Sequence, residues 1–81
     1  MDDADILTKI RALVDEEHDL RTRSEAGAID PDDERRRLTT LEESLDQCWD
    51  LLRQRRARRD AGQNPDAAHS RDVREVEGYL Q

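Results

Sequence analysis

The sequence predicts an all-α fold: an antiparallel, coiled-coil-like two-helix hairpin that dimerises into a four-helix bundle and carries a short C-terminal tail. Two observations predict it. Apolar residues recur at spacings of three and four along two segments, near 3–26 and near 31–61, as in helices that share an apolar seam. Between the segments, Gly27 is suited to end a helix, and Asp30 followed by Pro31 is suited to start the next one.

The first expected helix, near 3–26, has one apolar stripe, made of Ile6, Ile10, Leu13 and Leu20. Acidic residues at its start stand where the helix dipole favours negative charge. Glu17 occupies the missing step of the stripe, and an isolated buried carboxylate is costly. We therefore expect Arg21 or Arg37 to pair with Glu17, or its carboxylate to reach solvent.

The second expected helix, near 31–61, has a strict heptad seam, made of Leu38, Leu41, Leu45, Cys48, Leu52, Arg55 and Arg59. Gly62 and Pro65 follow its end. A single antiparallel register matches the two stripes, pairing Ile6 with Leu52, Ile10 with Cys48, Leu13 with Leu45 and Leu20 with Leu38. The second helix is longer and must overhang the first.

Residues 1–62 are thus expected to form the hairpin, and 63–70 a polar linker. The segment 71–81 is a short tail with apolar residues on one helical face, namely Val73, Val76, Tyr79 and Leu80. Three states of this tail remain open: docked on the overhanging end of the second helix, docked on another protomer, or disordered. The free energy gained by burying its apolar residues nearly equals the entropy cost of ordering them.

Composition excludes several classes of protein. A chain of 81 residues with 43% charged and 33% hydrophobic residues is one small domain. It is too short for a nucleotide-binding α/β domain or a barrel. The net charge of −7 disfavours nucleic acid and anionic membranes as partners, and no signal peptide or membrane span is expected. We expect a cytoplasmic protein. Thirteen of its basic residues are arginine and one is lysine, a bias typical of high-GC bacterial genomes.

A second apolar surface, beside the seam, is predicted to be the interface of a homodimer, made of Leu7, Val14, Trp49 and Leu51. A lone hairpin has little core, and chains of this size usually need a disulfide, a bound metal or a partner for stability. The single cysteine, Cys48, lies on the seam, where a buried and inert thiol is expected. An interchain disulfide or a redox-active thiol is the alternative. Cys48 cannot form an intrachain disulfide.

An electrostatic cluster is the most conspicuous polar feature, made of Arg53, Arg55, Arg56, Arg58 and Arg59. One interpretation is structural: these cations complement the helix C-terminus and face the acidic start of the first helix. The alternative is a nucleic-acid contact, although no aromatic residue is interleaved for base stacking. An acidic protein partner is a third possibility.

No catalytic, cofactor or metal site is expected. Asp15 and His18 share one helical face, and ferritin-like bundles bind metals with such pairs. However, both residues lie away from the seam, and the second helix has no histidine. No glycine-rich phosphate loop or paired-cysteine motif occurs. A carboxylate-metal protein is therefore only a minor alternative.

The stretch 41–59, which contains Cys48 and Trp49, and the ending 76–81 resemble a family of small bacterial proteins catalogued only as a domain of unknown function. The resemblance covers nearly the whole chain and implies a small all-helical cytoplasmic bacterial protein. It implies no catalytic residue. We expect a non-enzymatic, self-associating hairpin that acts as a protein–protein interaction or regulatory adaptor module.

Overall fold

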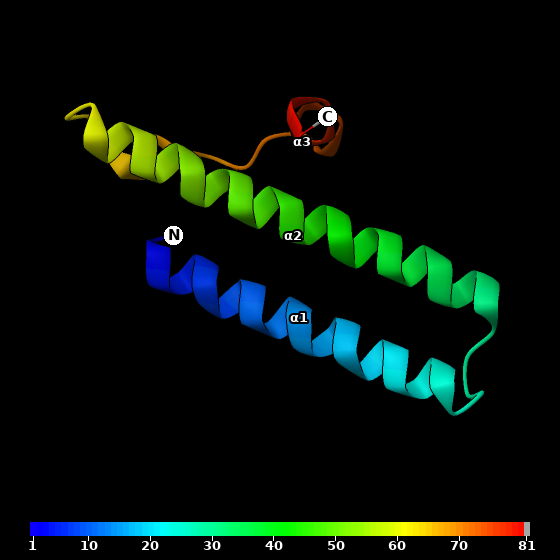
Figure 1. Ribbon diagram of the computed structural model, residues 1–81. Coiled ribbons are helices and arrows are strands. Elements are labelled where there is room, and N and C mark those ends of the chain that lie inside the picture. The colour runs from blue at the N-terminus through cyan, green and yellow to red at the C-terminus, as the bar shows by residue number, and fades with distance from the viewer. Residues whose placement is uncertain (81) are drawn as a thin grey trace.

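The structure is a computed structural model that describes residues 1–80, the side chains of Tyr79 and Leu80 excepted. Four helical elements follow one another: α1 (Asp3–Glu25), α2 (Pro31–Asp60), the 3₁₀ turn η1 (Pro65–Ala67) and α3 (Val73–Leu80). Figure 1 shows α1 and α2 side by side and antiparallel, with α3 on the opposite side of α2. The all-helical hairpin expected from the sequence is confirmed.

Local capping sets the start of α1. The backbone N–H of Asp5 donates to Asp2 Oδ1 at 2.8 Å, and the N–H of Asp2 donates to Asp5 Oδ2 at 3.1 Å. This reciprocal capping box satisfies two donors that would otherwise lack a partner at the helix end. The helix ends at Glu25, one residue before the expected end, and Gly27 follows with a φ of 72°.

The same chemistry begins α2. The Asp30 carboxylate accepts hydrogen bonds from the backbone N–H groups of Asp32 and Asp33, and Pro31 occupies the first helical position. Across the connecting loop, the Ser24 hydroxyl donates to Glu34 Oε2 at 2.5 Å and ties the two helices together. Gly62, with a φ of 73°, follows the end of α2.

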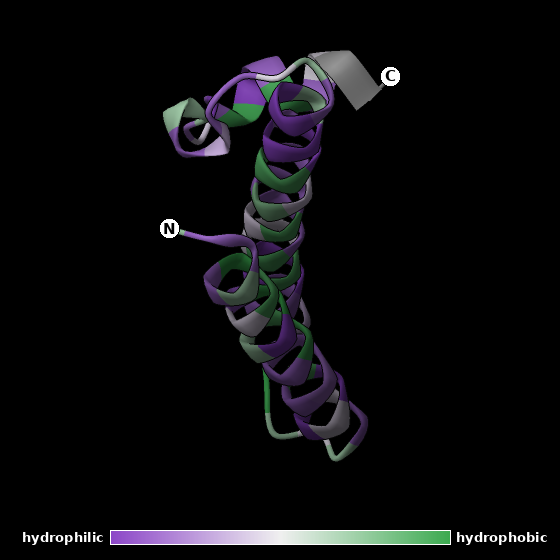
Figure 2. Cartoon of the chain, turned by 90° about the vertical axis from the view of Figure 1, so that its left-hand side faces the viewer, coloured by the Kyte–Doolittle hydropathy of each residue, from purple (hydrophilic) through white to green (hydrophobic). Residues whose placement is uncertain are grey.

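The core lies toward the N-terminal end of α1. Ile6, Ile10, Cys48 and Leu51 form its buried cluster. The partly buried residues packed against this cluster are Leu13, Leu45, Leu52 and Ala68. The expected register is confirmed at this end of the hairpin. Pairing Ile6 with Leu52 also places residue 3 opposite residue 55, and Arg55 Nε lies 2.5 Å from Asp3 Oδ1. Figure 2 shows how much of both helices is hydrophilic outside this cluster.

The linker is more ordered than its polar composition suggested. Asn64 accepts a hydrogen bond from the N–H of Asp66 and caps η1, whose first residue is Pro65. This turn packs on α2, and Ala68 packs against the core cluster. The linker, and not the tail, therefore covers the overhanging end of α2.

The C-terminal tail docks on its own α2. Val76 is 1% exposed, and Val73 is half-buried. The carboxylate of Asp72 accepts a hydrogen bond from the N–H of Arg74, which begins α3. The helix runs across α2 (Figure 1). The expected contributions of Tyr79 and Leu80 concern side chains outside the described part of the structure.

Candidate functional site

Three of the four residues expected at a dimer interface form an uncovered surface. Leu7, Val14 and Trp49 are 49%, 50% and 46% exposed. All three occupy the heptad position that follows a d residue of the seam, and in an antiparallel pair these positions lie on the same flank. We call Leu7, Val14 and Trp49 the apolar flank.

The expectation that Leu51 shares this surface is wrong. Leu51 is 7% exposed and belongs to the core cluster. It lies two positions from Trp49, and residues two apart on a helix point to nearly opposite sides. Ala68, from the segment after η1, packs against the cluster that contains Leu51. The chain thus covers one flank of the hairpin itself.

The arginine cluster is divided between internal pairs and solvent. Arg55 is 5% exposed, and it donates to Asp3, to Asp66 Oδ1 at 2.9 Å and to the Pro65 carbonyl at 3.2 Å. Arg59 lies 3.0 Å from Asp3 Oδ2. These contacts join the start of α1, the end of α2 and η1.

The remaining members of the cluster are less enclosed. Arg53 approaches Asp50 at 3.9 Å, Arg56 is exposed and Arg58 is half-buried. The five guanidinium groups therefore do not form one continuous basic surface.

Asp3, which pairs with Arg55 and Arg59, has a shifted pKa. Hydrogen bonds from Arg59 and then Arg55 lower the pKa of the Asp3 carboxyl below its ordinary value. The same pairing, first with Asp3 and then with Asp66, raises the pKa of Arg55. Both directions follow from stabilising the charged form of each group by an opposite charge.

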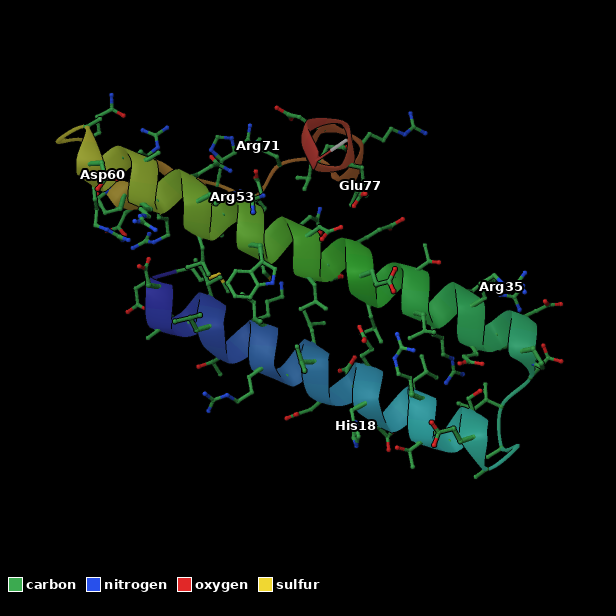
Figure 3. The ribbon with its side chains drawn as sticks, in the orientation of Figure 1. His18, Arg35, Arg53, Asp60, Arg71 and Glu77 are labelled. Atoms are coloured by element: carbon green, nitrogen blue, oxygen red, sulfur yellow. The ribbon has the colours of Figure 1, made fainter. Side chains whose placement is uncertain are left out.

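A buried carboxylate that the sequence did not indicate lies on the other side of α2. Asp50 is fully buried. Arg71 binds it with two hydrogen bonds, at 2.9 and 2.7 Å, and Gln54 donates a third at 3.0 Å. Figure 3 shows Arg71 over α2, near Arg53. Asp50 faces away from the seam, where a carboxylate is normally solvated, so helical periodicity gave no signal of its burial.

A shallow groove of about 450 Å³ opens between α1 and α2 near the connecting loop. Its floor is apolar, from Leu20 and Leu41. Its walls are polar and of mixed charge, namely Glu16, Asp19, Arg23, Arg36, Arg37 and Thr40. Arg23 and Arg36 already pair with Asp19 and Asp33.

Of the two partners expected for Glu17, Arg21 is the one that pairs with it, at 3.4 Å.

The described residues contain no group of three or more His, Cys, Asp or Glu residues placed to hold a metal ion. Asp15 and His18 are exposed, and Figure 3 shows His18 on the side of α1 that faces away from α2. Cys48 is a buried free thiol. None of the helices in the described part of the chain has the length and apolar character that crossing a membrane requires.

Comparisons with known proteins identify relatives and a family but assign no activity. Uncharacterised proteins of Mycobacterium bovis and of two strains of Mycobacterium tuberculosis are 48% identical over 77 residues, which is 95% of this chain and 88% of each relative. These organisms are high-GC bacteria, as the arginine bias suggested. No solved structure matches the chain. A family model described as "Protein of unknown function (DUF2630)" matches residues 2–81, and the chain therefore belongs to this family.

Proposed function

We propose that the protein is a non-enzymatic, self-associating helical hairpin that acts as a protein–protein interaction or regulatory adaptor module. The observation that carries the proposal is the apolar flank. Leu7, Val14 and Trp49 are each close to half exposed, and a cluster of large apolar side chains on a small soluble chain marks an interaction surface.

The two flanks of the hairpin differ in a way that supports this function. On one flank, the segment after η1 brings Ala68 against the core cluster that includes Leu51. On the other flank, the part of the chain that the structure describes leaves Trp49 at 46% exposure. Tryptophan is enriched among the residues that dominate binding energy at interfaces. A second molecule is therefore the natural cover for the apolar flank.

Charge complementarity favours a second copy of this chain as that molecule. Arg11 and Arg21 of α1 lie one or two turns from Leu7 and Val14. On α2, Glu42 lies two turns before Trp49 and Arg56 lies two turns after it. In a dimer whose two-fold axis runs parallel to the helices, α1 of each copy lies over α2 of the other. Glu42 of one copy then faces the basic residues Arg11 and Arg21 of the other.

The nucleic-acid alternative loses part of its basis. Arg55 is buried against Asp3 and Asp66, and Arg59 also pairs with Asp3. Phosphate contacts would compete with these internal pairs, and the chain carries a net charge of −7. A salt-dependent gel shift with duplex and single-stranded DNA addresses this alternative, and the proposal predicts no shift.

Sedimentation equilibrium over a range of concentrations tests the proposal. The wild type is expected to be dimeric at tens of micromolar. Trp49→Ala should weaken the dimer because it removes the largest apolar side chain of the flank. Arg11→Glu should weaken it less, and more at low salt than at high salt.

Glu25→Lys is the matched control. Glu25 is an exposed residue at the far end of α1, away from the apolar flank. This variant should associate as the wild type does. A wild type that stays monomeric at these concentrations, or a Trp49→Ala variant that dimerises as tightly as the wild type, would contradict the proposal.

A further inference from the structure

Two contacts of opposite kinds join the segment 71–77 to α2. At the beginning, just before the helix, Arg71 binds the fully buried Asp50 with two hydrogen bonds. Arginine bound to a carboxylate in this two-pronged geometry makes one of the stronger polar contacts in proteins. One turn into the helix, Val76 is 1% exposed.

Main-chain contacts strengthen the same end. Gln47 Nε2 donates to the carbonyl of Arg71 at 3.1 Å, and Gln54 Nε2 donates to the carbonyl of His69 at 2.9 Å. Both glutamines come from α2. The segment that leads into α3 is therefore bound through its backbone and through the Arg71 side chain.

The other end of the contact brings like charges together. Glu77 is half-buried and projects from α3 toward α2 (Figure 3). Asp46 and Glu43, both half-buried, lie one and two turns before Asp50 on the face of α2 against which α3 packs. Their carboxylates, with that of Glu42, are the negative charges that act on Glu77. α2 is the element packed against α3 in the described structure. Among the cations nearby, Arg71 binds Asp50 and approaches Glu75 at 3.9 Å, Arg53 approaches Asp50, and Arg74 is exposed.

Two neighbouring carboxylates cannot both ionise without cost, so the docked arrangement favours the protonated form of Glu77. The pKa of Glu77 is accordingly raised from its ordinary value of 4.5. The hydrogen bond with Asp46 is the largest cause, followed by partial burial and the negative charges of Asp46, Glu43 and Glu42. When α3 leaves α2, Glu77 regains water and loses these neighbours.

We propose that α3 is a pH-responsive latch: it is held on α2 while Glu77 carries a proton, and it loosens as Glu77 ionises against Asp46. Loosening exposes the face of α2 around Asp50 that the tail otherwise covers. This face borders the apolar flank at Glu42 but does not include Leu7, Val14 or Trp49, and the latch is a contact within one chain.

Proton linkage gives the direction and the size of the effect. A carboxyl whose pKa is higher in the docked state contributes to docking below its ordinary pKa, and this contribution is lost as the pH rises through the raised pKa. One such group changes the docking equilibrium by at most about tenfold per pH unit. Docking should therefore weaken as the pH rises from about 4.5 and become constant once Glu77 is ionised in both states.

The latch can be tested by NMR on the full chain. The Val76 methyl shifts report the docked fraction of α3, because this side chain is buried only when α3 lies on α2. In the wild type, the docking constant should fall with rising pH. Glu77→Gln should dock independently of pH and more tightly than the wild type at pH 8, because no second charge forms beside Asp46.

Two further variants make the test decisive. Asp46→Asn removes the opposing carboxylate and should likewise reduce the pH dependence. Glu75→Gln makes the same chemical change on a side chain of α3 that is 60% exposed and lies 3.9 Å from Arg71. Any change in its docking constant should be by the same factor at pH 5 and pH 8, so this variant should keep the wild-type pH dependence. The latch is refuted if α3 of the wild type is equally docked at pH 5 and pH 8, or undocked at both. It is also refuted if both Glu77→Gln and Asp46→Asn retain the wild-type pH dependence.

Discussion

Arg55 joins three parts of the chain through one side chain. It contacts Asp3 at the start of α1, Asp66 in η1 and the carbonyl of Pro65, while it is itself 5% exposed. A buried guanidinium is tolerated only when its donors are satisfied. The stability of the N-terminal end of the hairpin therefore depends on this residue more than on its exposed arginine neighbours.

Arg55→Gln is accordingly expected to lower the Tm of the protein more than Arg56→Gln does. Arg56 lies next to Arg55 on α2 and is exposed, so it is the matched control. Thermal unfolding followed by circular dichroism measures both. Equal Tm values for the two variants would mean that the contacts of Arg55 with Asp3 and Asp66 contribute nothing to stability.

Asp3 makes the hairpin sensitive to acid. Its pKa is lowered, first by Arg59 and then by Arg55, so its contribution to stability is present above the ordinary value of 3.8 and is lost as the pH falls through the lowered pKa. Asp3→Asn should make the Tm fall less steeply on acidification. If the Tm of this variant fell as steeply with decreasing pH as that of the wild type, the role of Asp3 would be contradicted. The effect is opposite in sign to that of Glu77.

At the scale of elements, α1 and α2 are held together unevenly along their length. The buried cluster of Ile6, Ile10, Cys48 and Leu51 lies near the start of α1. Toward the loop, Leu20 of α1 is buried, but Leu38 and Leu41 of α2 are only half-buried. The seam is regular in sequence, but the energy of packing is concentrated at the end that η1 and its neighbours also cover.

Ile10→Ala should therefore cost about 2–4 kcal/mol in the free energy of unfolding, the range for truncating a buried isoleucine. Leu38→Ala should cost less, because Leu38 is half-buried and truncation there leaves no closed cavity. Urea unfolding followed by circular dichroism compares the two. If Leu38→Ala lowered the free energy of unfolding more than Ile10→Ala, the main packing contact would lie nearer the loop, contrary to the structure.

Helical periodicity and capping chemistry were sufficient to predict α1 and α2. Their boundaries lie within one residue of those expected, because Asp30 followed by Pro31, Gly27 and Gly62 act locally. The pairing of Asp3 with Arg55 also followed from the register. These features depend on neighbours in sequence or on one regular seam.

The docking of the C-terminal segment could not be predicted in the same way. Asp50 and Arg71 are 21 residues apart, and their pairing depends on how the linker turns at η1. The position of Leu51 was misjudged for a related reason: a residue beside the seam is buried or exposed according to whether another segment covers it. No periodicity within α2 carries that information.

At the scale of the whole molecule, α2 is the central element. It contacts α1 along one side, η1 near its end and α3 on the side opposite α1. The apolar flank is the side of the hairpin that the described chain leaves open. Self-association through Leu7, Val14 and Trp49 is the proposal that gives this surface a role.

The intrinsic fluorescence of the wild-type protein tests this proposal most directly. Trp49 is the only tryptophan of the chain, and it is 46% exposed in the monomer. If two copies meet at the apolar flank, its emission maximum should shift to shorter wavelength as the protein concentration rises from nanomolar to tens of micromolar, and return on dilution. An emission maximum that stays the same over this range would show that Trp49 remains in water and would contradict self-association through this flank.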